Sequence, residues 1–135
     1  MKKKDKTILF VDDDMDFLNY VAESFRKDGY HVIAKTDGRA ALSVFNETRI
    51  DLVITDLKMP YMDGMEFISA LRSKTPLIPV ILLSGHGNVE LYFKALSYGV
   101  YEVINKPISM RELKVVAKSA LSGSSIGLAE HFPLR

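Results

Sequence analysis

Short apolar runs alternate with longer segments of helical periodicity along the chain. The apolar runs have the length of strands and occupy residues 8–11, 30–34, 51–55, 80–83 and 102–104. Between them, apolar residues recur three and four positions apart, as they do on one face of an α-helix. The regular exchange of the two patterns predicts an α/β protein, in which helices connect the strands of a parallel sheet.

Five helical segments accompany the strands, and the apolar stripe of each predicts the face that is buried. The stripes consist of Leu18, Val21, Ala22 and Phe25 in the first helix, Met65, Ile68 and Leu71 in the third, and Leu113, Val116, Ala117, Ala120 and Leu121 in the fifth. We expect the second helix over about 37–46. Gly29 and Gly99 are predicted to end the first and fourth helices, and Asn88 to cap the start of the fourth.

The length and composition indicate one domain. A chain of 135 residues with 47% hydrophobic residues can build a core without metal or disulfide support. We expect this domain to span residues 6–121, after a basic N-terminal tail at 1–5. Residues 122–135 begin with Ser-Gly-Ser-Ser and are predicted to be a linker or C-terminal tail. A stand-alone domain and the first domain of a longer protein remain equal alternatives.

Charge and hydropathy exclude several classes of function. The formal net charge of +1 gives no reason to expect direct binding to nucleic acid, and the four lysines among the first six residues are interpreted as a solvated tail. Cysteine is absent, so thiolate metal sites and disulfides are excluded. No apolar run approaches the roughly 20 residues of a membrane span. We therefore predict a cytoplasmic protein without membrane contacts.

Polar side chains follow four of the five predicted strands. Asp12, Asp13 and Asp14 come directly after the first strand, Asp56 follows the third, Ser84 the fourth and Lys106 the fifth. In a parallel α/β sheet the carboxyl ends of the strands lie along one edge, and ligands bind there beside the point where the strand order reverses. The sequence thus predicts a site with clustered carboxylates, a hydroxyl and an amine.

Clustered carboxylates repel one another unless a cation lies among them. Mg²⁺ suits this site because it prefers oxygen ligands and completes its shell with water and phosphate. Asp56 is then a candidate nucleophile for phosphoryl transfer, which depends mainly on positioning and on charge neutralisation. The alternative, that the first three aspartates only cap a helix, fits Asp14 but leaves Asp56 and Lys106 unexplained.

Four segments together identify a family resemblance. They are Val11-Asp12-Asp13-Asp14, Asp56-Leu57-Lys58-Met59-Pro60-Tyr61-Met62-Asp63-Gly64, Leu83-Ser84-Gly85-His86-Gly87 and Gly99-Val100-Tyr101-Glu102-Val103-Ile104-Asn105-Lys106-Pro107. In this order, and at these strand ends, they resemble the receiver domain of bacterial response regulators over about residues 6–121. The resemblance implies a flavodoxin-like fold: one doubly wound, five-stranded parallel sheet with five helices.

The resemblance also implies roles for individual residues. Asp56 matches the aspartate that is phosphorylated from a histidine kinase in a Mg²⁺-dependent reaction. Asp12 and Asp13 match the acidic pair that binds Mg²⁺ together with Asp56, and the backbone carbonyl of Lys58 is implied as a further ligand. Ser84 matches the hydroxyl residue that turns toward the phosphoryl group.

The last segment holds a further implied site residue and two departures from the family. Lys106 matches the lysine that pairs with the phosphoryl group, and its bond to the following proline is implied to be cis. Val103 stands at the switch position, where the family usually has an aromatic residue. Tyr101 is expected on the same side of its strand as Val103 and is a candidate substitute. Val100 replaces the usual alanine. His86 is expected at the rim of the site, where it modulates the approach of water.

The partners implied are a sensor histidine kinase or a phosphotransfer protein, an effector domain beyond this sequence, and a second copy bound through the fourth helix, fifth strand and fifth helix. The protein is expected to be a signalling switch and not an enzyme, catalysing only its own phosphorylation and dephosphorylation. Two alternatives stand beside it. An aspartyl-phosphate phosphatase would use the Asp12-x-Asp14 pattern but lacks room for a cap domain. A phosphorylation-independent binding module would use the same scaffold.

Overall fold

Helices and strands alternate throughout the computed structural model, which describes residues 5–85 and 89–123. The strands are β1 (Thr7–Val11), β2 (His31–Lys35), β3 (Leu52–Asp56), β4 (Val80–Ser84) and β5 (Glu102–Asn105). The helices are α1 (Met15–Lys27), α2 (Gly38–Val44), α3 (Gly64–Lys74), α4 (Val89–Ser97) and α5 (Met110–Leu121). None of the helices within the described ranges is long and apolar enough to cross a membrane.

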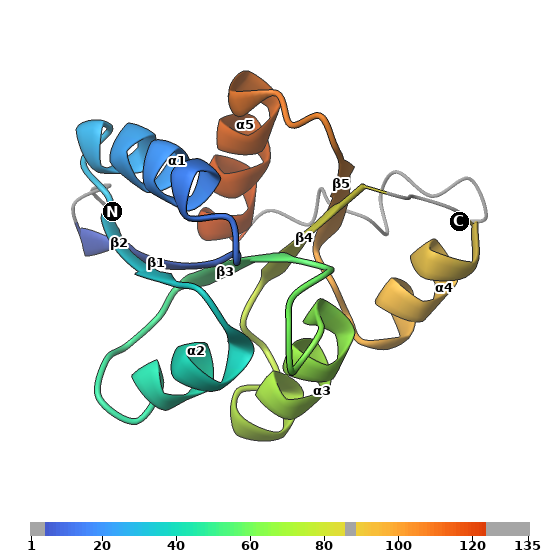
Figure 1. Cartoon of the computed structure of the whole chain (residues 1–135). Coiled ribbons are helices and arrows are strands. Elements are labelled where there is room, and N and C mark those ends of the chain that lie inside the picture. The colour runs from blue at the N-terminus through green and yellow to red at the C-terminus, as the bar shows by residue number, and fades with distance from the viewer. Residues whose placement is uncertain (1–4, 86–88, 124–135) are drawn as a thin grey trace.

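All strands pair in parallel in the order β2-β1-β3-β4-β5, so the strand order reverses at β1 and β3. Helices α1 and α5 cover one face of the sheet, and α2, α3 and α4 cover the other (Figure 1). The predicted doubly wound five-stranded sheet with five helices is therefore confirmed. Its reversal point places the carboxyl ends of β1 and β3 side by side.

Two apolar layers hold the helices against the sheet. Alternate residues of β1 divide between them, with Ile8 and Phe10 facing α1 and α5, and Leu9 and Val11 facing α2, α3 and α4. Strands β3 and β4 are buried along their whole length, as the nearly uninterrupted apolar runs predicted. A rigid sheet of this kind fixes the residues at its edge.

Several element boundaries differ from the predicted ones for local reasons. Tyr30 does not begin β2, because its N–H donates to the Phe25 carbonyl at the end of α1 and its ring packs on the Phe25 ring. Helix α2 ends at Val44, since the next two N–H groups bond to carbonyls three residues back instead of four. Asp56 and Ser84 are the last residues of β3 and β4, one position inside the strands.

The predicted start of α1 and the predicted ends of α1 and α4 are confirmed. Asp14 is the N-cap of α1, and its carboxylate accepts the N–H groups of Asp16 and Phe17. Gly29 and Gly99 have the positive φ of 99° and 67° that favours glycine after a helix. The predicted cap at Asn88 and the rim residue His86 lie outside the described residues, as do most of the two predicted tails.

Candidate functional site

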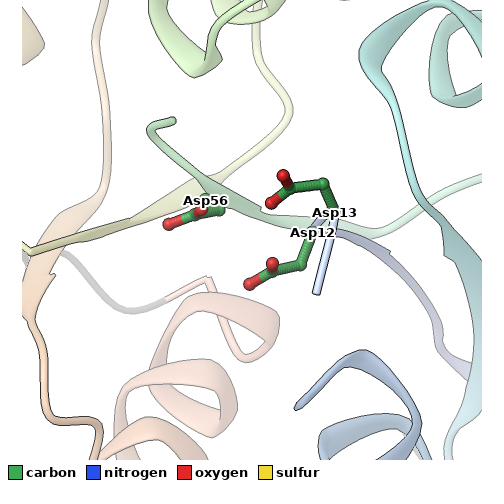
Figure 2. Close-up of side chains that lie close together, drawn as sticks. All are labelled: Asp12, Asp13 and Asp56. Atoms are coloured by element: carbon green, nitrogen blue, oxygen red, sulfur yellow. The ribbon is translucent and has the colours of Figure 1, made fainter. Parts of the chain in front are cut away.

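Three carboxylates meet at the reversal point of the sheet. Asp12 and Asp13 follow β1, and Asp56 ends β3, which is hydrogen-bonded to β1 (Figure 2). Each offers a carboxylate oxygen, and these atoms all lie within 4.8 Å of one another. Asp12 and Asp56 are buried, whereas Asp13 is exposed. The predicted acidic cluster is thus present as a structural feature.

Within the acidic cluster, the pKa of Asp12 is raised. Its pKa is raised from 3.8 to about 6, mainly by burial and also by the charges of Asp56 and Asp13, while the Asp14 N–H and the charge of Lys106 lower it. Its Oδ1 accepts the Asp14 N–H at 2.9 Å, but its Oδ2 is buried and has no hydrogen-bond partner among the described residues. Together with the carboxylates of Asp13 and Asp56, this oxygen forms a set of ligands that fits a hard divalent cation.

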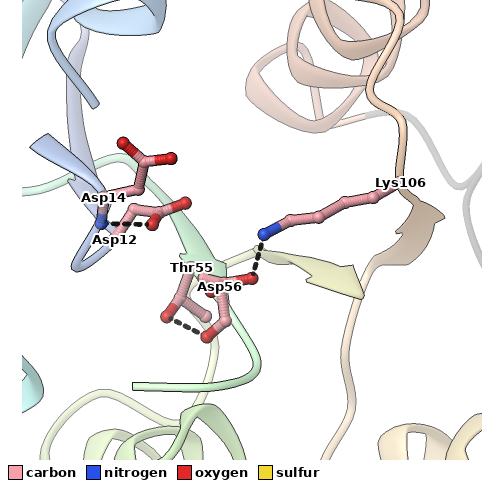
Figure 3. A network of polar contacts seen from close by, with 5 residues as sticks. All are labelled: Asp12, Asp14, Thr55, Asp56 and Lys106. Carbon is pink, nitrogen blue, oxygen red and sulfur yellow. Dashed lines mark hydrogen bonds and ion pairs between the residues drawn. The ribbon is translucent and has the colours of Figure 1, made fainter. Parts of the chain in front are cut away.

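Lys106 reaches across the sheet edge to the acidic cluster. Its Nζ lies 2.8 Å from Asp56 Oδ1, as Figure 3 shows. Burial lowers the pKa of Lys106, but the hydrogen bond and charge of Asp56, with the charges of Asp12 and Asp13, outweigh burial and raise it. The ammonium group is therefore held in its charged form beside Asp56.

Ser84 lies next to both Asp56 and Lys106 along the sheet edge. It is fully buried at the end of β4, and its backbone carbonyl accepts the Lys106 N–H at 2.7 Å. The preceding residue, Leu83, is the register partner of Asp56. The peptide bond from Lys106 to Pro107 is cis, as the resemblance implied. The Lys58 side chain is exposed and takes no part in the cluster.

The switch positions divide between the two faces of the sheet. Val103 is buried in the layer that faces α4, together with Val100 and Ala95. Tyr101 packs in the opposite layer, and its hydroxyl bonds to the Ser119 hydroxyl of α5 at 2.7 Å. The prediction that Tyr101 shares the side of Val103 is wrong, because Tyr101 precedes β5 and the alternation of the strand does not extend to it. Tyr101 therefore does not substitute at the switch position.

Two residues that support the site were not predicted. Phe17 of α1 has its ring centroid 5.8 Å from Lys106 Nζ, although the two residues are far apart in the sequence. Gly64 of α3 lies against β3, where an added Cβ would come within 2.5 Å of the Asp56 carbonyl oxygen and 2.8 Å of Leu57 Cα. The Asp-Gly pair at the start of α3 was a visible signal for Gly64. No sequence pattern pointed to Phe17, because its contact depends on the fold.

Asp14 is separated from the cluster by its role in α1. Its carboxylate is occupied by two helical N–H groups, while that of Asp12 faces the site (Figure 3). An Asp-x-Asp phosphatase site would require both side chains of this pair to serve the chemistry. The two side chains of the Asp12-x-Asp14 pair therefore do not face one site.

Comparison with known sequences agrees with this geometry. The family model described as the response regulator receiver domain matches residues 8–118. The chain is 34% identical over 125 residues to the transcriptional regulatory protein GlrR of Escherichia coli (strain K12), covering 93% of this chain and 28% of that protein. It is 34% identical over 116 residues to the nitrogen assimilation regulatory protein NtrX of Azorhizobium caulinodans, covering 84% and 26% respectively. The chain thus spans about a quarter of the length of these curated relatives.

Solved structures give the same picture. A response regulator receiver domain protein from Clostridium thermocellum superposes with a TM-score of 0.81 at 31% identity, covering 87% of this chain and 95% of that one. The chemotaxis protein CheY4 of Vibrio cholerae superposes with a TM-score of 0.82 at 28% identity, covering 86% and 98%. Both likenesses extend over nearly the whole of the solved chains.

Proposed function

The chain belongs to the response regulator receiver domain family, and we propose that it accepts a phosphoryl group on Asp56 from a histidine kinase or a phosphotransfer protein. The reaction depends on Mg²⁺, and phosphorylation switches the conformation of the domain. The single observation that carries this proposal is the buried carboxylate of Asp56, which faces an acidic pair on one side and the Lys106 ammonium, at 2.8 Å, on the other.

The arrangement suits Asp56 as the nucleophile. One of its carboxylate oxygens forms a bond to phosphorus as the bond from phosphorus to the donor's imidazole nitrogen breaks, and the electron pair of that bond leaves with the imidazole. The Lys106 ammonium then pairs with an oxygen of the transferred group. The burial of the Asp56 carboxylate strengthens this pairing.

Asp12, Asp13 and Asp56 would hold the metal, with the Lys58 backbone carbonyl as a further ligand. The unpartnered Oδ2 of Asp12 supports this assignment, because a buried charged oxygen without a partner is costly. When bound, Mg²⁺ neutralises charge that develops on the equatorial phosphoryl oxygens. The negative charges of Asp12 and Asp13 also offset the positive charge of Lys106 at this edge of the sheet.

The switch begins at Ser84. Its hydroxyl turns toward the phosphoryl oxygens and donates a charge-assisted hydrogen bond, which draws the end of β4 toward Asp56. Since Val103 carries no ring, the signal reaches the outer face through a shift of α4 and not through an aromatic swing. The apolar layer beneath α4, with Ala95, Val100 and Val103, supports a change between two packings.

The further proposed partners are an effector domain and a second copy of the chain. The relative GlrR is about three and a half times as long as the stretch matched here, which supports an effector domain in the complete protein. Exposed apolar side chains at Val89 and Phe93 of α4 and Val115 of α5 support a homodimer through the α4–β5–α5 face. The domain itself is a signalling module in the cytoplasm, and its catalysis is limited to its own phosphorylation and dephosphorylation.

The proposal is tested by intact mass after incubation with acetyl phosphate and Mg²⁺. We expect the addition of one phosphoryl group to the wild type, and none in EDTA or in Asp56→Asn. Asp37→Asn is the matched control, because it removes one carboxylate charge at the N-cap of α2, where asparagine also caps well. Full labelling of Asp56→Asn, or equal labelling in Mg²⁺ and EDTA, would contradict the proposal.

A further inference from the structure

The Lys106 ammonium has to stay at the site when its partner, the Asp56 carboxylate, is phosphorylated. In the described structure it pairs with an Asp56 oxygen, and its side chain is still about one third exposed, at 36%. Under the proposed function, that same carboxylate becomes bonded to phosphorus and also binds metal. The lysine side chain is a flexible chain of four carbons, and it loses considerable conformational entropy when one ion pair alone fixes it.

The Lys106 ammonium has a second contact, with the ring of Phe17. Lys106 Nζ lies 5.8 Å from the centroid of the Phe17 ring, within the range at which a cation is attracted to an aromatic face. This attraction does not involve the Asp56 carboxylate as a partner. It also leaves the N–H groups of the ammonium available to oxygen acceptors.

The Phe17 ring is itself fixed in place. It packs edge-on against Phe10 of β1, with ring centroids 6.0 Å apart and an interplanar angle of 68°. Its backbone N–H donates to the Asp14 carboxylate at 3.2 Å, in the first turn of α1. The hydrogen bond fixes the backbone of Phe17, and the contact with Phe10 orients its ring beside Lys106.

We propose that Phe17 is a positioning residue for phosphoryl transfer to Asp56, because its ring holds the Lys106 ammonium at the site independently of the Asp56 carboxylate. The inference rests on the proposed function. A purely structural role, in which Phe17 only fills space beside Phe10, would be served by leucine. The positioning role requires an aromatic ring, so tyrosine replaces phenylalanine and leucine does not.

The experiment compares Phe17→Leu and Phe17→Tyr in the full chain. With acetyl phosphate and saturating Mg²⁺, we expect Phe17→Leu to be labelled about fivefold more slowly than the wild type, and Phe17→Tyr to remain within about twofold. Mg²⁺ affinity from calorimetry should change by less than about twofold in either variant. Tyr20→Leu is the matched control on α1, since Tyr20 is an exposed aromatic residue.

A readout independent of labelling is the NMR shift of the Lys106 ε-methylene protons. The ring current of Phe17 shifts them upfield in the wild type, and we expect that shift to be lost in Phe17→Leu and kept in Phe17→Tyr. An unshifted wild type, a Phe17→Leu labelled at the wild-type rate, or a Phe17→Tyr as slow as Phe17→Leu would overturn the positioning role. Absence of labelling in the wild type, with the ring-current shift intact, would instead overturn the proposed function.

Discussion

Asp12 bears its negative charge at a cost to the folded protein. Because burial raises the pKa of its carboxyl from 3.8 to about 6, the unfolded chain ionises first as the pH rises, and folding stability falls between these two values. The cost is absent below the unfolded pKa and complete above the folded one. Metal binding at the acidic cluster would offset it, which links stability to the proposed Mg²⁺ site.

Asp12→Asn should stabilise the metal-free protein at about pH 7 by about 2 kcal/mol, because the buried negative charge is removed. At about pH 3 the variant and the wild type should be nearly equally stable, since the carboxyl is then mostly protonated in both states. Urea unfolding in EDTA at the two pH values measures the difference. A variant that is less stable than the wild type at the higher pH would show that the Asp12 charge is well compensated without metal.

Gly64 is required by the close approach of α3 to the end of β3. In Gly64→Ala the new methyl group meets the Asp56 and Leu57 backbone, which cannot move without disturbing the site. We expect a loss of about 2 kcal/mol in unfolding free energy and slower labelling of Asp56. Gly85→Ala is the control, because an added Cβ there meets no described residue within 4 Å, and its stability should change by less than about 0.5 kcal/mol. Equal effects of the two substitutions would contradict this account.

Among the elements, α3 and α4 are joined through one side chain. The Arg72 guanidinium on α3 donates to the carbonyls of Tyr98 and Gly99, which follow α4, and to those of Pro76 and Ile78, which precede β4. Burial lowers its pKa. The fork of donors on arginine thus ties the end of α4 to the neighbouring helix, and lysine could not reproduce it.

Arg72→Ala should lower the unfolding free energy by about 2 kcal/mol and increase amide exchange between Tyr98 and Tyr101, because four carbonyls lose a charged donor. Lys74→Ala, on an exposed position of the same helix, should change stability by less than about 0.5 kcal/mol. Exchange at the end of α4 that is the same in Arg72→Ala and wild type would show that the guanidinium does not hold this joint.

The response to phosphorylation should be restricted at β5, because Val103 offers no ring to bury or expose. With a beryllofluoride mimic, we expect amide exchange in the wild type to change at Ser84, Gly85 and the start of α4, with little change from Val100 to Ile104. Val103→Tyr should extend the response into β5, at some cost in stability, since Val103 is buried. A wild-type response that already spans β5, and that the substitution leaves unchanged, would contradict this prediction.

For the molecule as a whole, the alternation of apolar runs and helical stripes was sufficient to predict the order of the elements, the parallel sheet and the edge at which Asp12, Asp56 and Lys106 meet. Long, strongly patterned segments determine these features. Contacts between segments distant in the sequence could not be predicted in the same way. The Phe17 ring lies near Lys106 only because α1 packs back over the sheet. Tyr101 and Val103 lie on opposite faces of the sheet, because β5 begins at Glu102 and its alternation does not include Tyr101.

The identity of the phosphorylated residue is the most direct test of the whole account. The protein is phosphorylated with acetyl phosphate and Mg²⁺, treated with borohydride, which reduces an aspartyl phosphate to homoserine, and mapped by peptide mass spectrometry. We predict homoserine at position 56 in the wild type, and at neither position 12 nor position 13. Homoserine at another aspartate, or its absence from position 56 in a protein that has taken up phosphate, would contradict Asp56 as the phosphoacceptor.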